Sequence, residues 1–346
     1  MNTHEFYLNR CIQLAKNGMG TTYPNPLVGS VIVHDGKIIG EGWHRKAGEA
    51  HAEVNAVNSV KDQSLLATST IYVSLEPCSH FGKTPPCCDL IIKHKIPKVV
   101  IGTVDPNSKV AGTGIKRLME NGCQVTVGIL EDACIKLNKR FFTFHNKKRP
   151  YIILKWAESK DGFMAPITKE KKEPFWISNS YSRQLTHKWR SEEQAILVGT
   201  KTVLDDNPKL DVRDWKGKNP IRIVLDKSGK ITDTYFVKDQ KTKTIVITEH
   251  ENSISSENII YESVIFDRQL TQKIIRILYQ HNIQSVIVEG GNKTLQTFID
   301  DNLWDEARVF TGNISLNEGI KAPQLTGIFK TTDIKGDQLK LFLNHD

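Results

Sequence analysis

Short apolar runs alternate with amphipathic segments along the first half of the chain. The runs have the length of strands, and the amphipathic segments repeat apolar residues at helical spacing. We predict strands at residues 28–34, 70–75, 98–103 and 124–128. We predict helices at residues 4–16, 50–60, 86–95 and 114–121. Alternation of this kind indicates an α/β fold, in which helices cover the faces of a sheet.

The second half of the chain shows the same kind of alternation. We predict strands at residues 151–157, 195–199, 221–225, 244–248 and 285–289. We predict helices at residues 180–190 and 269–281, and a further helix that Gly290 and Gly291 open and that runs to about residue 300. The second half is therefore also α/β, with no internal repeat.

A polar stretch, residues 144–150 (FHNKKRP), separates the two halves. It ends in proline, which is typical of a linker. A chain of 346 residues also exceeds the ~100 to 200 residues that one core usually organises. We therefore predict two domains, residues 1–146 and 150–346, and interpret the basic run from Lys147 to Arg149 as part of a solvated linker.

The composition is that of an ordinary globular chain, with 39% hydrophobic and 25% charged residues. No apolar run reaches the ~18 to 20 residues of a membrane span, and residues 1–16 lack the apolar core of a signal peptide. We therefore expect a cytoplasmic protein without a membrane partner. The 47 Lys and Arg residues exceed the 39 Asp and Glu residues, but the excess is spread over both halves. That distribution argues against nucleic acid as a partner and suits an anionic small substrate.

Histidine, glutamate and cysteine residues stand at a spacing typical of a zinc site. His51 and Glu53 lie where a helix should begin, and Cys78 opens a loop that Cys87 closes. One imidazole and two thiolates supply three ligands of a catalytic zinc, which leaves the fourth position for a water whose pKa falls toward ~7. A His-x-Glu pattern followed by Pro-Cys is typical of zinc deaminases, in which the glutamate is the general acid and base.

The second thiolate ligand has a rival. Eight residues separate Cys78 from Cys87, so Cys88 is also a candidate. Cys87 follows Pro86 directly, and a proline in the first turn of a helix places the next thiolate at the helix N-terminus, where partial positive charge favours it. We therefore prefer Cys87. The alternatives are a closed structural zinc site that includes Cys88, or buried cysteines without a metal.

At these residues the chain resembles the family of bifunctional riboflavin-biosynthesis deaminase/reductases. The resemblance runs through the motifs PNPLVGSVIV (24–33), GEGWH (40–44), AGEAHAEVNA (47–56), YVSLEPCSHFGKTPPCC (72–88) and DPNSKVAGTGI (105–115). It implies an N-terminal cytidine-deaminase-like domain with three αβα layers. It also implies one zinc ion per chain on His51, Cys78 and Cys87, with Glu53 as the proton carrier.

The resemblance further implies a substrate, 2,5-diamino-6-(5-phosphoribosylamino)pyrimidin-4(3H)-one, whose 2-amino group is replaced by oxygen. Asn25 offers an amide to the pyrimidine edge, and Lys83 in the zinc loop offers a cation to the phosphate. Asn25 stands between two prolines and is equally consistent with a turn residue. The alternative for Lys83 is a solvated side chain.

A glycine pair follows the predicted strand at residues 285–289. Backbone N–H groups at the start of the next helix would face an anion, although a strand, Gly-Gly and a helix also make an ordinary tight turn. The chain has no G-x-G-x-x-G fingerprint. The family resemblance continues through the motifs LKWAESKDGFMA (154–165), HKWR (187–190), ILVGTKTVLDDNPKLDVR (196–213), PIRIVLD (220–226) and VEGG (288–291). It implies a C-terminal dihydrofolate-reductase-like α/β domain that depends on NADPH.

Two sets of binding residues follow from the resemblance in this domain. NADPH is expected on Ala157, Trp176, Thr202, Asp206, Gly291, Asn292, Lys293, Thr294, Leu295, Gln296 and Thr297. The substrate is expected on Arg190, Leu210, Arg213 and Glu289. Two guanidinium groups suit a phosphate, and a carboxylate suits sugar or ring donors. The alternatives are surface salt bridges for the two arginines and helix capping for Glu289.

The chain departs from the family pattern at three positions of the second domain. Glu158 and Lys160 replace residues of a small and apolar run, and Pro174 stands where a serine commonly contacts the substrate. One lost hydrogen bond costs about 0.5 to 1.5 kcal/mol. We therefore expect a reductase that is active with altered substrate binding.

The leading interpretation is a two-domain enzyme of riboflavin biosynthesis that deaminates a phosphoribosyl pyrimidine and then reduces its ribosyl group to ribityl. One alternative is a deaminase of another base or nucleotide whose second domain has lost the hydride-transfer step. Another is a nucleic-acid-editing or zinc-stabilised binding module, for which the spread charge and 8% aromatic residues are a poor fit. The resemblance also implies a homo-oligomer, either a dimer or a tetramer.

Overall fold

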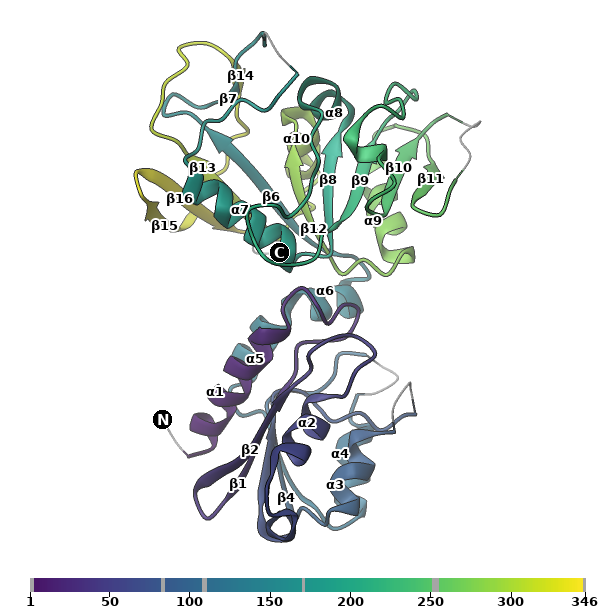
Figure 1. The fold of residues 1–346 in the computed structure, drawn as a ribbon, viewed down its shortest axis with the longest axis vertical. Coiled ribbons are helices and arrows are strands. Elements are labelled where there is room, and N and C mark those ends of the chain that lie inside the picture. Colours follow the sequence, from purple (N-terminus) through teal and green to yellow (C-terminus); the bar gives the residue numbers. More distant parts are fainter. Residues whose placement is uncertain (1–2, 82–84, 108–110, 170–171, 251–254, 345–346) are drawn as a thin grey trace. The chain divides into compact units, whose positions relative to one another are not determined.

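The computed structural model describes the chain except for residues 1–2, 82–84, 108–110, 170–171, 251–254 and 345–346. The chain divides into two compact units, Met1–Lys148 and Arg149–Asp346. Both units are built from sheets and helices, as the apolar pattern predicts (Figure 1). None of the helices in the described ranges is long and apolar enough to cross a membrane.

The first unit contains a five-stranded sheet in the order β2-β1-β3-β4-β5. Its strands are β1 (Gly29–His34), β2 (Lys37–Trp43), β3 (Thr70–Val73), β4 (Lys98–Ile101) and β5 (Gln124–Val127). Strands β3, β4 and β5 are parallel, and β1 is antiparallel to both β2 and β3. The carboxyl ends of β3 and β4 therefore lie at one edge of the sheet, where loops bring the zinc-motif residues together.

Helices cover both faces of this sheet. They are α1 (Thr3–Ala15), α2 (Ala52–Ser59), α3 (Cys87–Lys93), α4 (Thr113–Glu120), α5 (Glu131–Leu137) and α6 (Lys139–Lys147). Apolar residues of α2, α3 and α4 pack in one core cluster with the inner strands, and α1 packs in a separate cluster on the opposite face. The unit has the three αβα layers expected from the sequence (Figure 1).

The second unit contains a nine-stranded sheet in the order β11-β10-β9-β8-β12-β6-β13-β16-β15. Its strands are β6 (Tyr151–Glu158), β8 (Ala195–Gly199), β9 (Ile221–Leu225), β10 (Thr244–Thr248), β11 (Ile259–Ser263), β12 (Ser285–Gly290), β13 (Glu306–Thr311), β15 (Ile328–Ile334) and β16 (Asp337–Leu343). The strands from β11 to β13 are parallel, and β16 and β15 add an antiparallel edge. A separate two-stranded sheet pairs β7 (Phe163–Ala165) with β14 (Ile320–Lys321).

Helices also cover both faces of the larger sheet. They are α7 (Ser180–Glu192), α8 (Thr200–Asp206), α9 (Leu270–Gln280) and α10 (Asn292–Asp300). Apolar residues of α9 and α10 pack in one core cluster, whereas those of α7 and α8 pack in another. Strands β8 and β10 are buried throughout, because helices cover both faces of the sheet.

The helices and strands that the sequence predicts are present to within a few residues, but the prediction misses others, including three that carry motif residues. The missed elements are β2, α5, α6, β7, α8, β11, β13, β14, β15 and β16. The interpretation of Lys147 to Arg149 as part of a solvated linker is wrong in part, because Lys147 still belongs to α6, in which Phe144 is buried. Arg149 is also buried, and its guanidinium donates to both oxygens of Asp305 at 2.6 and 2.8 Å.

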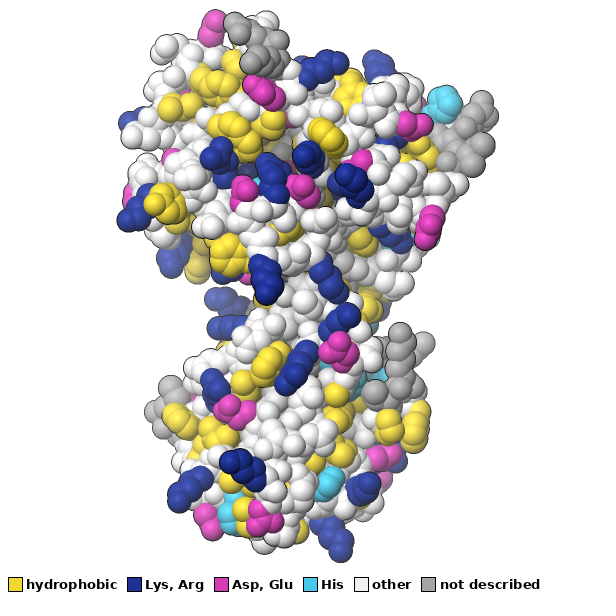
Figure 2. Space-filling view, in the orientation of Figure 1, with side chains coloured by type: hydrophobic (Ala, Val, Ile, Leu, Met, Phe, Trp, Pro, Cys, Tyr) yellow, Lys and Arg dark blue, Asp and Glu magenta, His cyan; other side chains and the backbone are white. Residues whose placement is uncertain are grey.

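Charged side chains of both signs lie interspersed on the face of each unit that Figure 2 shows. Basic side chains do not gather on this face into a single large patch (Figure 2). This distribution agrees with the even spread of charge along the sequence and differs from the basic stripe typical of nucleic-acid binders.

Candidate active sites

Three metal-ligating side chains of the first unit converge at the carboxyl edge of its sheet. His51 immediately precedes α2, Cys78 lies in the loop after β3, and Cys87 is the first residue of α3. Their donor atoms all lie within 4.8 Å of one another. The Nδ1 atom of His51 is 3.6 Å from the Cys78 sulfur and 3.3 Å from the Cys87 sulfur.

These distances fit a tetrahedral zinc ion. Zn–S bonds of about 2.3 Å and a Zn–N bond of about 2.0 Å place the nitrogen and a sulfur roughly 3.6 Å apart. Three ligands leave one coordination position for water, as in catalytic zinc sites. The residues present therefore suit a catalytic zinc ion bound through His51 Nδ1 and two thiolates.

Cys88, the rival ligand, faces a different direction. Its thiol contacts the carbonyl oxygens of Pro77 at 3.3 Å and Gly114 at 3.6 Å, and it belongs to the apolar core of the unit. Burial raises the pKa of this thiol, which disfavours the thiolate that a zinc ligand requires. Within the described residues, the metal-ligating cluster contains Cys87 and excludes Cys88.

Glu53 lies in the first turn of α2 and is only 3% exposed. Burial, followed by the nearby Cys78 sulfur, raises the pKa of its carboxyl to about 7. A carboxyl group with a pKa near neutrality can both accept and release a proton at working pH. Helix α2 thus brings a buried, titratable carboxyl group beside the three candidate ligands, because Glu53 follows His51 by two residues.

Asn25 is connected to the candidate zinc ligand His51 through a second histidine, His44. The Nδ1–H of His44 donates to the carbonyl of Ala50 at 3.1 Å, so its Nε2 accepts from the Asn25 amide at 3.0 Å. The rings of His44 and His51 meet edge to face, with centroids 5.3 Å apart. This contact uses the amino group of Asn25 and leaves its carbonyl oxygen for a ligand. Lys83 lies outside the described residues.

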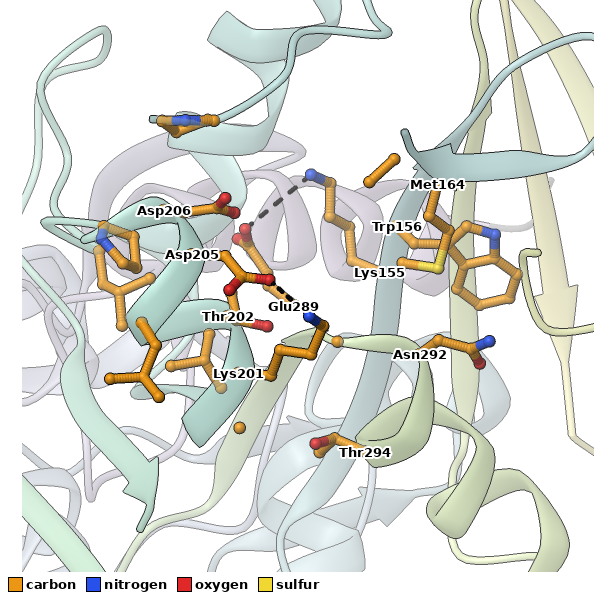
Figure 3. Close-up of a pocket in the computed structure, with 18 of the residues that line it drawn as sticks. Lys155, Trp156, Met164, Lys201, Thr202, Asp205, Asp206, Glu289, Asn292 and Thr294 are labelled. Carbon is orange, nitrogen blue, oxygen red and sulfur yellow. Dashed lines mark ion pairs between the residues drawn. The ribbon is translucent and has the colours of Figure 1, made fainter. Parts of the chain in front are cut away.

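The second unit contains a cavity of about 1290 Å³ at the carboxyl ends of β6, β8, β9 and β12. Residues from the start of α8 and of α10 line one side of it, and Figure 3 shows Thr202 and Thr294 on these two helices. Gly199 and Gly290 let the backbone approach closely. A Cβ on Gly199 would lie 2.5 Å from the Thr294 hydroxyl, and Gly290 has a φ of 133°.

Most residues expected to bind NADPH line this cavity. They are Ala157, Trp176, Thr202, Asp206, Gly291, Asn292, Lys293, Thr294 and Thr297. Leu295 and Gln296 do not line it, because Leu295 is fully buried in the core and Gln296 donates to Asp300. The helical spacing explains this result, since successive residues of α10 face different directions.

The expected substrate residues also line the cavity, but two of them bind each other. Arg190 donates to both carboxylate oxygens of Glu289, at 2.8 and 2.7 Å. The ammonium of Lys155 lies 3.9 Å from the same carboxylate (Figure 3). Burial alone would raise the pKa of Glu289, but Arg190 and Lys155 lower it to about 2. Glu289 is therefore an ionised carboxylate between two cations.

Arg213 and Leu210 line another part of the cavity on the loop after α8. Arg213 is 42% exposed at its side chain and pairs with Asp211 at 2.8 Å. Leu210 is buried and has a φ of 52°. The Nδ1–H of His187 donates to the Asp211 carbonyl at 2.9 Å, which ties this loop to α7.

Both units match known families. Residues 1–103 match the cytidine and deoxycytidylate deaminase zinc-binding region, and residues 150–330 match the RibD C-terminal domain. A riboflavin biosynthesis protein RibD from Aquifex aeolicus is 40% identical over 329 residues, which cover 92% of this chain and 89% of that protein. The chain belongs to the RibD family. RibD from Escherichia coli is 36% identical and covers 88% of this chain and 86% of its own length.

A solved RibD-family structure extends the likeness to the whole fold. The diaminohydroxyphosphoribosylaminopyrimidine deaminase/5-amino-6-(5-phosphoribosylamino)uracil reductase of Thermotoga maritima is 36% identical, with a TM-score of 0.87 and 99% of each chain covered. Acinetobacter baumannii RibD is 30% identical, with a TM-score of 0.90 and 99% of each chain covered. This RibD-family chain is thus a bifunctional deaminase and reductase of riboflavin biosynthesis.

Two of the three departures from the RibD pattern lie away from the cavity. Glu158 and Lys160 do not line it. The Glu158 carboxylate accepts from the Trp156 indole at 3.0 Å and from Thr311 at 3.2 Å. Glu158 is therefore paired with neighbouring side chains at the carboxyl end of β6. Pro174 does line the cavity. Of the three, only Pro174 can alter ligand contacts directly.

Among the cavity residues of the RibD reductase unit that the sequence reasoning missed are two lysines, each of which pairs with a predicted site residue. Lys155 lies in the run YIILKWA, where a charged residue in a buried strand was a usable signal. Lys169 donates to Asp206 from the segment between β7 and α7. That segment has no regular pattern, so no signal in the sequence pointed to Lys169.

Proposed function

We propose that the first unit deaminates 2,5-diamino-6-(5-phosphoribosylamino)pyrimidin-4(3H)-one with one zinc ion per chain. The convergence of His51, Cys78 and Cys87 beside a buried glutamate is the observation that carries this proposal. The likeness to the Thermotoga maritima diaminohydroxyphosphoribosylaminopyrimidine deaminase supports the substrate class. Asn25 and Lys83 complete the proposal, as contacts to the pyrimidine and to the phosphate.

The residues of the first unit divide the reaction between them. When bound, zinc supplies the Lewis acidity that makes water nucleophilic at neutral pH. Glu53 carries two protons in turn: it passes one from the attacking water to the ring nitrogen next to carbon 2, and a second from the resulting C–OH group to the amino group, which leaves as ammonia. The Asn25 carbonyl oxygen, left unused by His44, accepts a hydrogen bond from the ring and orients carbon 2 toward the ligands.

Cys87→Ser is expected to reduce the zinc content from one ion per chain to less than a tenth, because a neutral hydroxyl replaces a thiolate ligand. Metal analysis of the purified protein measures this content. Cys88→Ser is the matched control and should retain zinc, since its hydroxyl can donate to the same two carbonyls. Zinc loss in Cys88→Ser, with retention in Cys87→Ser, would contradict the ligand assignment.

For the second unit, we propose that it reduces the ribosyl group of 5-amino-6-(5-phosphoribosylamino)uracil to ribityl with NADPH. The large cavity between the starts of α8 and α10 supports a dinucleotide site. No side-chain cap occupies the first turn of α10, so its N–H groups are available to a phosphate. Ala157, Trp176, Thr202 and Asp206 are the further cofactor contacts that we propose.

The substrate contacts follow from the charges in the cavity. NADPH, when bound, supplies the hydride that adds to carbon 1 of the opened ribose. Arg213 is exposed enough to meet a phosphate, whereas the guanidinium of Arg190 is already held by Glu289. We therefore assign the phosphate chiefly to Arg213, and assign sugar hydroxyls to Glu289 with Arg190. A homo-oligomer, a dimer or a tetramer, is part of the same proposal on the ground of the family resemblance.

The test incubates zinc-loaded protein with the diaminopyrimidine ribosyl phosphate, with and without NADPH, and identifies products by mass spectrometry. We expect the oxo product without NADPH and its ribityl form with NADPH. Deaminated product that is never reduced would contradict the reductase assignment and favour a second domain that has lost the hydride-transfer step. No conversion in either reaction would contradict the substrate itself.

A further inference from the structure

A buried glutamate immediately precedes the Pro-Cys pair of the zinc loop. Glu76 is 4% exposed, and its carboxylate accepts four backbone N–H groups. Its Oε2 accepts from Asp105 at 3.3 Å and Gly112 at 3.0 Å. Its Oε1 accepts from Gly114 at 2.9 Å and Ile115 at 3.3 Å. One side chain therefore binds the backbone after β4 and the backbone at the start of α4.

Other contacts join the zinc loop to the start of α4. The hydroxyls of Ser79 and Thr113 are 2.7 Å apart, and Arg117 donates to the Ser79 carbonyl at 3.2 Å. Gly114 lies so close to the zinc loop that a Cβ would be 2.2 Å from the Pro77 carbonyl oxygen. The start of α4 thus packs against the zinc loop. Of the side chains named here, Glu76 makes the most hydrogen bonds between the two.

The backbone that Glu76 holds leads to polar groups beside the zinc ligands. The Glu76 N–H donates to the Thr103 carbonyl at 3.0 Å, which anchors the other side of the same turn. Asp105 is half-buried, its carboxylate accepts the Asn107 N–H at 2.8 Å, and it interacts electrostatically with His80 and Cys78. Glu76 thus holds the loop that carries Asp105 against the zinc loop that carries Cys78.

We propose that Glu76 is a positioning residue of the deaminase, which holds residues 105–107 and 112–115 in place against the zinc loop. Glu76 is not one of the metal ligands, and its carboxylate is occupied by backbone donors. It acts on the reaction through the segments that it holds, chiefly on substrate binding. This inference rests on the proposed function of the first unit.

Glu76→Gln tests the inference because the side chain keeps its shape while one acceptor oxygen becomes a donor. The NH₂ group then opposes two backbone N–H groups, either those of Gly114 and Ile115 or those of Asp105 and Gly112, and releases them. We expect the KM for deamination to rise about tenfold or more, with a smaller change in kcat. Zinc content and the reductase rate of the same chain should stay at the wild-type level. Hydrogen exchange at Gly112, Gly114 and Ile115 should become faster.

The matched control is Glu41→Gln, which removes a carboxylate that Arg10 holds with two hydrogen bonds in the same unit. It should leave the deamination KM unchanged. The inference is overturned if Glu76→Gln keeps both KM and exchange within twofold of wild type. It is also overturned if zinc, kcat and exchange protection are lost together throughout the unit, because that result indicates a purely structural role.

A second variant and the wild-type protein distinguish failure of this inference from failure of the proposed function. If Glu76→Gln does not fold, Thr113→Val removes the hydroxyl contact between the same segments and should raise KM in the same direction. An unchanged KM in Thr113→Val would then count against the inference. A wild-type protein that binds zinc but does not deaminate the substrate would instead overturn the proposed function, whatever the exchange data show.

Discussion

Replacing Glu53 by glutamine is expected to lower the deamination rate by about 10²- to 10⁴-fold, the usual contribution of a positioned general acid and base. The carboxyl is buried beside Cys78 and Cys87, and burial raises its pKa to about 7. A glutamine amide has the same shape but can neither accept nor deliver a proton at this position. The loss should therefore appear in kcat.

Mass spectrometry of the product, or ammonia release, measures this loss in the zinc-loaded protein. Zinc content should remain at one ion per chain, since Glu53 is not in the metal-ligating cluster. The reductase rate in the same chain serves as an internal control, and Glu120→Gln on the exposed face of α4 is a matched substitution. A Glu53→Gln variant with more than a tenth of the wild-type rate would contradict the proton-carrier role.

The convergence of three potential metal ligands was predictable because metal chemistry requires particular residue types at particular spacings. Histidine before a helix and cysteine at the start of another helix are local features, so the sequence identified His51, Cys78 and Cys87. The choice between Cys87 and Cys88 was also local, since adjacent residues of a helix face different directions. The role of Glu76 was not predictable, because its partners lie 29 to 39 residues away.

The reductase site was less predictable for the same reason. The resemblance identified Arg190 and Glu289 separately, but it could not show that they bind each other across 99 residues of chain. Strand β13 was missed because charged residues interrupt its pattern, and the structure buries Glu306 and Arg308 as an ion pair at 2.6 Å. Strand β15 was missed because most of its residues are exposed, which removes the alternation that indicates a strand.

Glu289→Gln is expected to destabilise the second unit by about 3 to 5 kcal/mol, because it leaves Arg190 and Lys155 as buried cations without their shared partner. Chemical unfolding followed by a probe in the second unit measures this change at pH 7. Glu262→Gln removes a partly exposed carboxylate paired with His281 and is the control, with an expected cost of about 1 kcal/mol or less.

The pH dependence of stability follows from the direction in which the pKa of Glu289 is shifted. Arg190 and Lys155 lower the pKa of Glu289 from 4.5 to about 2, so the ionised carboxylate stabilises the folded state above pH 4.5. Wild-type protein should lose this contribution, on the order of 3 kcal/mol, as the pH falls from about 4.5 to about 2. The variant should lack this part of the acid dependence. An identical acid profile in both proteins would contradict the assigned pairing.

A double replacement separates the structural from the catalytic part of this cluster. Adding Arg190→Met to Glu289→Gln removes one of the two cations left without a partner, and Lys155 remains, so the double variant should recover part of the lost stability. Reduction should remain at least about 100-fold slower than in wild type, because the carboxylate that we assign to the sugar hydroxyls is still absent. Deamination in the same chain should be unaffected. Recovery of both stability and reduction in the double variant would show that Glu289 only balances charge and does not contact the substrate.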